Sequence, residues 1–279
     1  MARRFDLVDV FAGEDFAGNP LAVIRADEGL STERMLAITR WLNLSETTFL
    51  LPPGDPAADY RVRIFTLERE MPFAGHPTLG TCHAWLEAGG VPKKSDVVMQ
   101  ECGLGLVPVR RDAGRLAFAA PPLLRSGPVS EDDLREALLI LNLGREAVVE
   151  ARWIDNGPGW LGIMLASAEA VLAVDYQRAW PRRADIGLIG LYPPGHDTAC
   201  ELRAIFSDDT LTLREDPVTG SLNASVAQWL YESGRISGGY VASQGGRLGR
   251  KGRIHVRYDG EGTIWIGGAT RTMFTGRMA

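Results

Sequence analysis

The chain has 279 residues and a formal net charge of −5, with 30 Lys and Arg against 35 Asp and Glu, and 45% of its residues are hydrophobic. This length is enough for two ordinary hydrophobic cores, and the scattered basic residues argue against a nucleic-acid partner. No apolar run approaches the roughly 20 residues that a spanning helix needs, so we expect no membrane partner and a cytoplasmic location.

Apolar periodicity predicts strands and helices in both parts of the chain. In chain order, the expected elements are a strand over 5–10, a helix after Ser31, a strand over 49–51, a strand over 60–65, a helix over 79–88, a helix after Ser130, a helix over 222–232 and a strand over 254–258. The Pro-rich segment Ala120-Pro121-Pro122 marks the expected boundary between residues 1–120 and 121–279, and the last strand is free to return to the first half.

The chain also repeats itself, which indicates duplication of one unit. The segment Arg69 to His76 lines up with Arg214 to Ser221 and keeps Arg, Glu, Pro and Gly at one constant offset. Residues 105–112 match 252–259 in the same way. A weaker match aligns the helix after Ser31 with the helix after Ser130, which places Arg145 where the first half has Glu46.

Each copy of the first repeat ends in a turn that starts a helix, Gly75-His76-Pro77-Thr78 in one half and Gly220-Ser221 in the other. Ser221 is expected to be the N-cap of the second helix. If the halves face each other, both helix starts would present free N–H groups to one cleft, where they favour a carboxylate. The implied partner is a small carboxylate substrate.

Five motifs, in order along the chain, are similar to those of one known family. They are Asp9-Val10-Phe11, Gly18-Asn19-Pro20-Leu21-Ala22-Val23, Leu44-Ser45-Glu46-Thr47, Pro72-Phe73-Ala74-Gly75-His76-Pro77-Thr78 and Glu215-Asp216-Pro217-Val218-Thr219-Gly220-Ser221. With the ending Trp265-Ile266-Gly267-Gly268, they resemble the PhzF-type phenazine-biosynthesis isomerase family over essentially the whole chain. Leu67 departs from the family pattern, which often has Pro there.

The resemblance implies an α+β fold of the diaminopimelate-epimerase-like type, in which two pseudo-symmetric halves each wrap a mixed sheet around a central helix and the active site lies between them. It implies that Glu46 is the general acid/base and that His76 and Asp216 assist as catalytic residues. The substrate-binding residues that it implies are Ser45, Gly75, Gly220 and Ser221. No cofactor and no metal are implied, and a homodimer is expected.

A glutamate in this role works best when apolar surroundings raise its pKa toward the operating pH. The candidate apolar walls are Phe49, Phe73 and Trp160.

Two alternatives remain open. An amino-acid racemase or epimerase of the same fold would need two facing thiols, but Ala74 and Val218 occupy the expected positions and Cys82 falls inside a helix. Like Cys102 and Cys200, Cys82 lacks CxxC or Cys/His ligand spacing, so we expect reduced, mostly buried thiols. The second alternative is a non-catalytic protein that binds a small ligand.

Overall fold

A computed structural model describes residues 3–26, 29–112 and 114–278. The chain divides into two compact units. The first unit holds Met1–Ala119 together with Gly267–Ala279, and the second holds Ala120–Ile266. No helix in the described part of the chain is long and apolar enough to cross a membrane.

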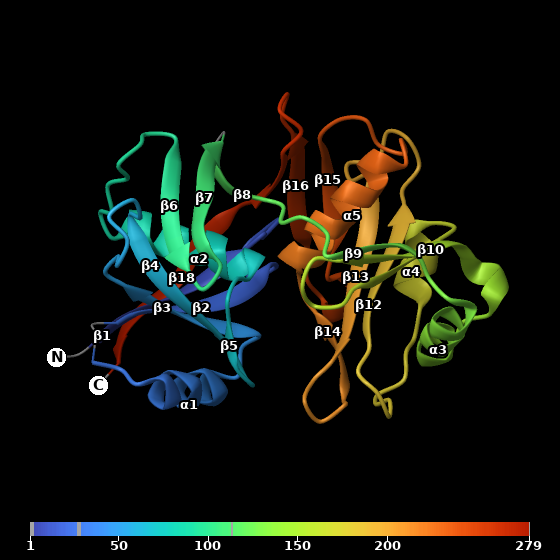
Figure 1. The fold of residues 1–279 in the computed structure, drawn as a ribbon, viewed down its shortest axis with the longest axis horizontal. Helices are drawn as coiled ribbons and strands as arrows, with labels where there is room; N and C mark the ends of the chain where they lie inside the picture. The colour runs from blue at the N-terminus through green and yellow to red at the C-terminus, as the bar shows by residue number, and fades with distance from the viewer. Residues whose placement is uncertain (1–2, 27–28, 113, 279) are drawn as a thin grey trace. The chain divides into compact units, whose positions relative to one another are not determined.

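The first unit is a mixed sheet with two helices (Figure 1). Its elements are β1 (Arg3–Val10), β2 (Asn19–Arg25), α1 (Thr32–Leu42), β3 (Glu46–Leu51), β4 (Tyr60–Thr66), β5 (Glu70–Met71), α2 (Gly75–Glu87), β6 (Val97–Cys102), β7 (Gly105–Asp112), β8 (Arg115–Ala119) and β18 (Thr270–Met278). The last strand, β18, pairs antiparallel with the first strand, β1, along its whole length. The C-terminal segment therefore completes the sheet of the N-terminal unit.

The second unit has the same kind of architecture. Its elements are β9 (Arg125–Pro128), α3 (Glu131–Leu141), η1 (Arg145–Ala147), β10 (Val148–Asp155), β11 (Leu161–Leu165), α4 (Ala168–Ala173), β12 (Asp185–Leu191), β13 (Cys200–Ser207), β14 (Leu213–Asp216), α5 (Gly220–Glu232), β15 (Tyr240–Gln244), η2 (Gly246–Leu248) and β16 (Gly252–Tyr258). One further strand, β17 (Ile264–Gly268), leads back to the first unit.

The two units share one strand topology, as expected of a duplication. In the first unit β2 runs parallel to β3, which pairs antiparallel with β4, and β4 runs parallel to β6. In the second unit β11 runs parallel to β12, which pairs antiparallel with β13, and β13 runs parallel to β15. The predicted α+β fold of two similar halves is confirmed.

One predicted correspondence was wrong. The helices α1 and α3 look alike, because each has 11 residues, a Ser N-cap and an Asn C-cap in the left-handed conformation. However, α1 connects the parallel strands β2 and β3, and the helix at that place in the second unit is the short α4. Arg145 is therefore not the counterpart of Glu46.

Strand register identifies the true counterpart. Ile64 of β4 faces Met71, and Ala204 of β13 faces Asp216 at the repeat position of Met71. Two residues further along each strand, Thr66 of β4 faces Glu46 and Phe206 of β13 faces Asp185. Asp185 thus occupies the place of Glu46 in the second unit.

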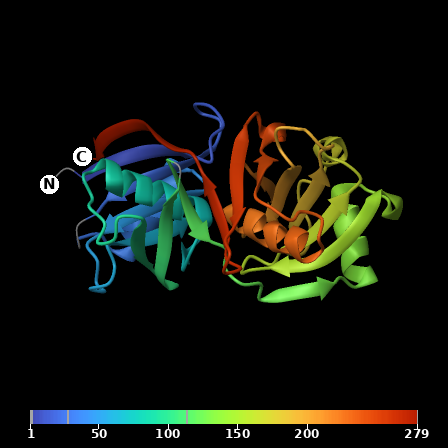
Figure 2. The same cartoon turned by 90° about the horizontal axis from the view of Figure 1, so that it is seen from above.

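Each unit contains one long buried helix, α2 in the first and α5 in the second (Figures 1 and 2). Nine of the 13 residues of each helix are buried, so apolar and small residues occur on every side of both helices. The helix α2 packs close to β1 and β2 at Gly80, where a Cβ would lie 2.5 Å from Cδ2 of Leu21 and 2.9 Å from Cγ2 of Val10. The predicted arrangement of a sheet around a central helix is confirmed.

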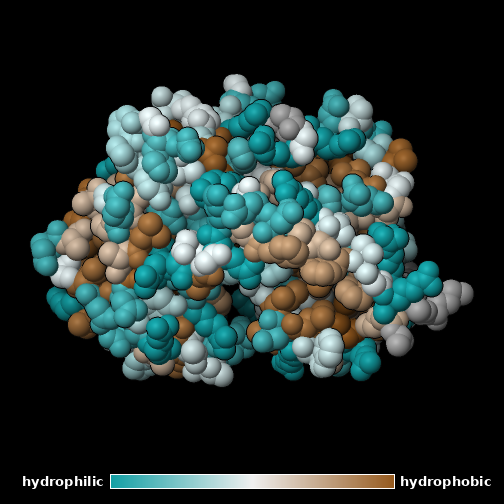
Figure 3. Space-filling view, turned by 180° about the vertical axis from the view of Figure 1, so that it is seen from behind, coloured by the Kyte–Doolittle hydropathy of each residue, from teal (hydrophilic) through white to brown (hydrophobic). Residues whose placement is uncertain are grey.

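The opposite side of the first sheet is covered less completely by α1. Ile24, Met35, Phe49 and Phe65 form a buried cluster there. A groove of about 540 Å³ lies between α1 and the strands β1, β2 and β18, and Trp41, which lines it, is 84% exposed. Apolar surface on this unit is visible in Figure 3.

Candidate active site

Glu46 is the first residue of β3, in the middle of the first sheet. The strand is held by β2 on one side and by β4 on the other, so its backbone position is fixed by two ladders of hydrogen bonds. The Glu46 side chain is 18% exposed, whereas Thr47 and Thr48, which follow it, are fully buried. The Glu46 carboxylate is thus mostly buried, and its Oε2 atom is buried completely.

His76 lies beside this carboxylate. It is the second residue of α2, its side chain is 4% exposed, and its Nε2 atom lies 3.6 Å from Oε2 of Glu46. Burial lowers the pKa of His76 to about 3. The imidazole is therefore neutral at physiological pH, and only one of its two nitrogens carries a proton.

Buried hydroxyl groups fix the helix against the strand. Thr81 of α2 donates a hydrogen bond of 2.8 Å to Oγ1 of Thr48, and the Thr48 hydroxyl donates to the carbonyl of Ala22 on β2. Since residues two apart on a strand share a face, Thr48 and Glu46 both face α2. The hydroxyl contacts therefore fix the position of α2, which carries His76, relative to β3, which carries Glu46.

The same alternation corrects one predicted apolar wall. Phe49 lies three residues from Glu46, on the opposite face of β3, and packs against Met35 of α1 and edge-on against Phe65. Phe49 is fully buried in that cluster and does not face the carboxylate. Phe73, half-buried just before α2, packs edge-on against Phe118.

The start of α2 has no side-chain cap. Ala74 is the N-cap residue and cannot accept a hydrogen bond through its side chain, and Gly75, the first helical residue, is buried. The first-turn N–H groups that a cap would satisfy are left for another acceptor. Ser45, half-buried, directly precedes Glu46 on β3.

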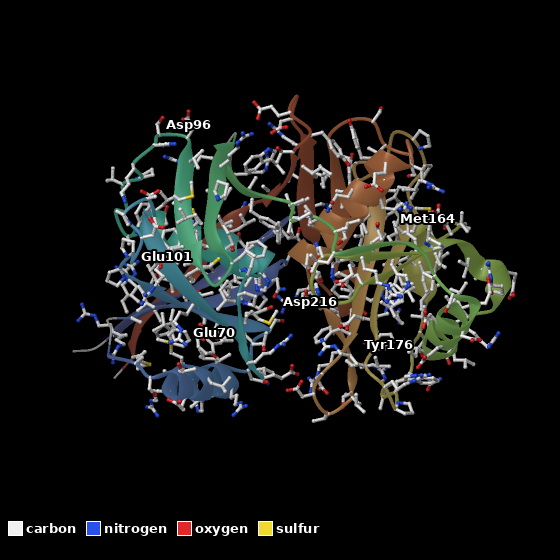
Figure 4. All side chains as sticks on the ribbon, in the orientation of Figure 1. Glu70, Asp96, Glu101, Met164, Tyr176 and Asp216 are labelled. Carbon is white, nitrogen blue, oxygen red and sulfur yellow. The ribbon has the colours of Figure 1, made fainter. Side chains whose placement is uncertain are left out.

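The other predicted site residues belong to the second unit. Asp216 ends β14, and its Oδ2 atom accepts a hydrogen bond of 2.6 Å from the hydroxyl of Thr219, the N-cap of α5 (Figure 4). Gln244, fully buried on β15, donates to that hydroxyl and to the Asp216 carbonyl. Its Oε1 atom accepts from the Thr219 N–H and from Asn223. Gln244 thus clamps the turn that presents Asp216.

Ser221 is the second residue of α5 and not its N-cap, contrary to the prediction. The helix already begins at Gly220, so Thr219 holds the cap position. The Ser221 hydroxyl oxygen accepts a hydrogen bond of 3.1 Å from the indole N–H of Trp160. Because that oxygen acts as acceptor, the hydroxyl proton can be donated to another group. Trp160, a predicted apolar wall, therefore also orients Ser221.

None of the three cysteines belongs to the first turn of α2 or α5. Cys82 lies inside α2 and is fully buried, and this burial raises its pKa to about 12. Burial also raises the pKa of Cys200 and that of the half-buried Cys102. The three cysteines are free, and two of them are buried, as predicted.

One detail of the predicted racemase comparison was wrong. The residue that corresponds to Ala74 in the second unit is Thr219, not Val218, because Ala74 and Thr219 are the N-cap residues of α2 and α5. Neither N-cap residue carries a thiol. A racemase that uses two facing thiols at these positions is therefore not supported.

Sequence reasoning missed three residues that hold the predicted ones in place: Asn19, Thr219 and Gln244. Asn19 and Thr219 lie within motifs that the sequence analysis quoted, so their position was available although their contacts were not. Gln244 carries no local signal, since only the pairing of β15 with β13 and β16 brings it to the start of α5.

Two units of one topology, each built around a central helix, define the diaminopimelate-epimerase-like class of α+β proteins. The structure of a hydroxyproline epimerase from Agrobacterium vitis has this fold, with a TM-score of 0.57 and 13% identity over all of this chain and 92% of that one. The chain belongs to the family described as phenazine biosynthesis-like protein (PhzC-PhzF), which matches residues 8–276. The predicted family resemblance is confirmed.

Individual relatives agree with this assignment over nearly their full length. Trans-2,3-dihydro-3-hydroxyanthranilate isomerase of Pseudomonas aeruginosa is 32% identical over 263 residues, 93% of this chain and 91% of that protein. Antisense-enhancing sequence 1 of Schizosaccharomyces pombe is 33% identical over 292 residues, 98% and 97% of the two chains. The structure of a predicted epimerase from P. aeruginosa superposes with a TM-score of 0.81 at 28% identity and covers 99% of both chains. The chain is thus a PhzF-type isomerase at the level of its family.

Proposed function

We propose that this protein isomerises a small unsaturated or cyclic carboxylate and that Glu46 is its single general acid/base. The observation that carries the proposal is the pairing of Glu46 with a buried, neutral His76 at 3.6 Å, on a strand and a helix that buried hydroxyls hold together. A mostly buried carboxylate at the start of a strand, beside a neutral imidazole, is suited to both taking and giving a proton.

The proposed reaction is balanced within the substrate. The ionised Glu46 removes a proton from one carbon as the C–H bond breaks, and the electron pair moves through the adjacent double bond. The protonated Glu46 then returns the proton to a second carbon, and a new C–H bond forms. Nothing is oxidised or reduced.

A single acid/base agrees with the fate of the equivalent residue. Asp185 stands at the place of Glu46 in the second unit, but its Oδ2 atom accepts a 2.9 Å hydrogen bond from Arg183. A charge-assisted pair of this kind favours the ionised form of the carboxylate and occupies its oxygen. We therefore assign proton transfer to Glu46 alone.

Five further residues are assigned to substrate binding. The starts of α2 and α5 have no side-chain caps, and Ser221 has a hydroxyl proton to donate. Uncapped N–H groups at helix starts favour an anion, so we assign Gly75 in the first unit, and Gly220 and Ser221 in the second, to the binding of an anionic substrate. Asp216, held by Thr219, is assigned to a hydrogen-bond donor of the substrate. Ser45 completes the proposed set.

Proton exchange followed by NMR is the test. The enzyme would be incubated in heavy water with trans-2,3-dihydro-3-hydroxyanthranilate, the compound in the name of one relative, and with a panel of small unsaturated carboxylates. We expect isomerisation with deuterium incorporated at carbon. Glu46→Gln should lower the exchange rate about 10²–10⁴-fold, the usual contribution of a positioned acid/base.

The matched control is Glu70→Gln, the same chemical change on β5 of the same unit. Glu70, labelled in Figure 4, forms a salt bridge with Arg63 and is more exposed than Glu46. We expect this variant to exchange at the rate of the unmodified protein. Full exchange by Glu46→Gln would remove Glu46 from the mechanism, and equal affinity for a carboxylate and its amide would remove the carboxylate assignment.

A further inference from the structure

Asn19, the first residue of β2, lies against the far side of the His76 ring. It is fully buried, and its Nδ2 atom lies 3.5 Å from Nδ1 of His76. The turn before it is fixed by Asp9, whose carboxylate accepts hydrogen bonds from the N–H groups of Ala17 and Gly18. Only glycine fits at position 18, because a Cβ there would lie 2.2 Å from the carbonyl oxygen of Val10. These contacts fix the backbone position of Asn19 beside the His76 ring.

A neutral imidazole has two tautomers, and its neighbours select between them. One nitrogen carries the proton and donates, while the other presents a lone pair and accepts. Oε2 of Glu46 faces Nε2, and a lone pair on Nε2 would repel an ionised carboxylate. The favourable arrangement puts the proton on Nε2 and leaves Nδ1 as the acceptor, which requires a donor on its side of the ring.

We infer that Asn19 is a positioning residue that sets the tautomer of His76, donating through its amide to Nδ1 so that the only ring proton lies on Nε2 and faces Glu46. Asn supplies such a donor at neutral charge, whereas Asp has nearly the same shape and can only accept when ionised. A carboxylate at position 19 would draw a proton onto Nδ1. The neutral ring would then lack a proton on Nε2, the nitrogen that faces Glu46.

The role of this tautomer in turnover rests on the proposed function. A proton on Nε2 directs an uncharged donor toward Glu46, 3.6 Å away, and could stabilise an oxyanion that develops on the substrate beside it. In the other tautomer that donor is lost although every atom of the ring stays in place. We therefore expect loss of the Nε2 proton to slow turnover about 10²–10⁴-fold, with little effect on KM.

Nitrogen-15 NMR of the imidazole side chains tests the inference without substrate. The chain has four histidines, and the resonances that disappear in His76→Gln identify the ring in question. In the unmodified protein we expect an unprotonated Nδ1 and a protonated Nε2. In Asn19→Asp we expect the single ring proton to lie on Nδ1, which leaves Nε2 unprotonated, together with the loss of turnover.

The matched control is Gln100→Glu, which also replaces a fully buried amide by a carboxylate in the first unit. Gln100 accepts a hydrogen bond from the Tyr60 hydroxyl and donates one to Thr78, whereas Asn19 lies against Nδ1 of His76, so the ring should keep its protonation state in this variant. If Asn19→Asp does not fold, Asn19→Ala replaces it. Removal of the donor should then give a mixture of both tautomers.

Two outcomes would overturn the inference: a protonated Nδ1 in the unmodified protein, or an unprotonated Nδ1 in Asn19→Asp. An altered ring in Asn19→Asp combined with full activity of Glu46→Gln would leave the inference standing and would remove the proposed function instead. The spectra therefore test the inference about Asn19, and the activity of Glu46→Gln tests the proposed function independently.

Discussion

Glu46 and Asp185 occupy the same place in the two units, yet only Glu46 lies beside a neutral partner. Each is the first residue of the strand that follows a helical crossover. Glu46 faces Thr66 near the end of β4, and Asp185 faces Phe206 near the end of β13. Glu46 has His76 near it, whereas Asp185 is bonded to Arg183. The two units thus carry a carboxylate at the same place, but the neighbouring residue differs: His76 beside Glu46 and Arg183 beside Asp185.

Asp185→Asn should keep most of its isomerase activity, because the proposed mechanism uses Glu46 alone. The loss of a charge-assisted hydrogen bond to the half-exposed Arg183 should lower the free energy of unfolding by about 1–2 kcal/mol. Urea unfolding and the exchange assay would be run beside Glu46→Gln. Equal losses of activity in the two variants would favour a two-base mechanism.

Buried His76 should make the protein less stable as the pH falls. Its folded pKa, about 3, is below the unfolded value near 6.5, so the unfolded chain binds the extra proton between these values. Stability from this group is full above pH 6.5 and falls by up to about 1.4 kcal/mol per pH unit toward pH 3. Comparing His76→Gln with the unmodified protein from pH 7 to 4.5 isolates this slope, and parallel stability curves would contradict it. Activity between pH 5 and 8 should likewise show no titration of His76.

Cys82→Ala should remain active. The thiol is sealed inside α2 with its pKa raised to about 12, so it is neither ionised nor accessible at neutral pH. A small cavity should cost about 1 kcal/mol of stability. We expect unchanged exchange kinetics and no reaction of Cys82 with a thiol reagent in the folded protein. A variant that folds but has lost activity would revive a thiol mechanism.

The buried ion pair of Arg203 and Glu215 should be critical for the strand that carries Asp216. Both side chains are 2% exposed, and Arg203 also donates to the carbonyls of Val171 and Val174. Arg203→Met leaves a buried carboxylate without its partner and should cost about 3–5 kcal/mol. Adding Glu215→Leu should restore part of that loss. Denaturant unfolding of both variants measures the difference, and a single variant as stable as the unmodified protein would contradict the prediction.

The parts of the site that the sequence located well are those within short motifs. Glu46, His76 and Asp216 each lie in a distinctive motif. In the fold, Glu46 begins β3, His76 lies in the first turn of α2, and Asp216 ends β14. Local sequence also marks where the central helices begin to within a turn. Contacts such as that of Gln244 with the Asp216 turn depend on pairing of distant strands, which no local pattern encodes.

The mistaken match of α1 with α3 has the same physical cause. A Ser cap, an amphipathic stretch and a left-handed Asn are features that many helices share, since each satisfies the free groups at a helix end. They describe how a helix starts and stops, but not which strands it connects. The misplacement of Phe49 arose because three residues along a strand reverse the face of the side chain.

The pairing of β1 with β18 has a consequence for the order in which the protein forms during synthesis. Arg3 lies opposite Met278, so β1 is made before the second unit and its neighbour β18 is made after it. The second unit, continuous in sequence, has its whole chain available earlier. Since domains fold as units during synthesis, the second unit can finish first, while β1 waits with one edge unpaired. The half that carries Glu46 is therefore completed only after the second half has been made.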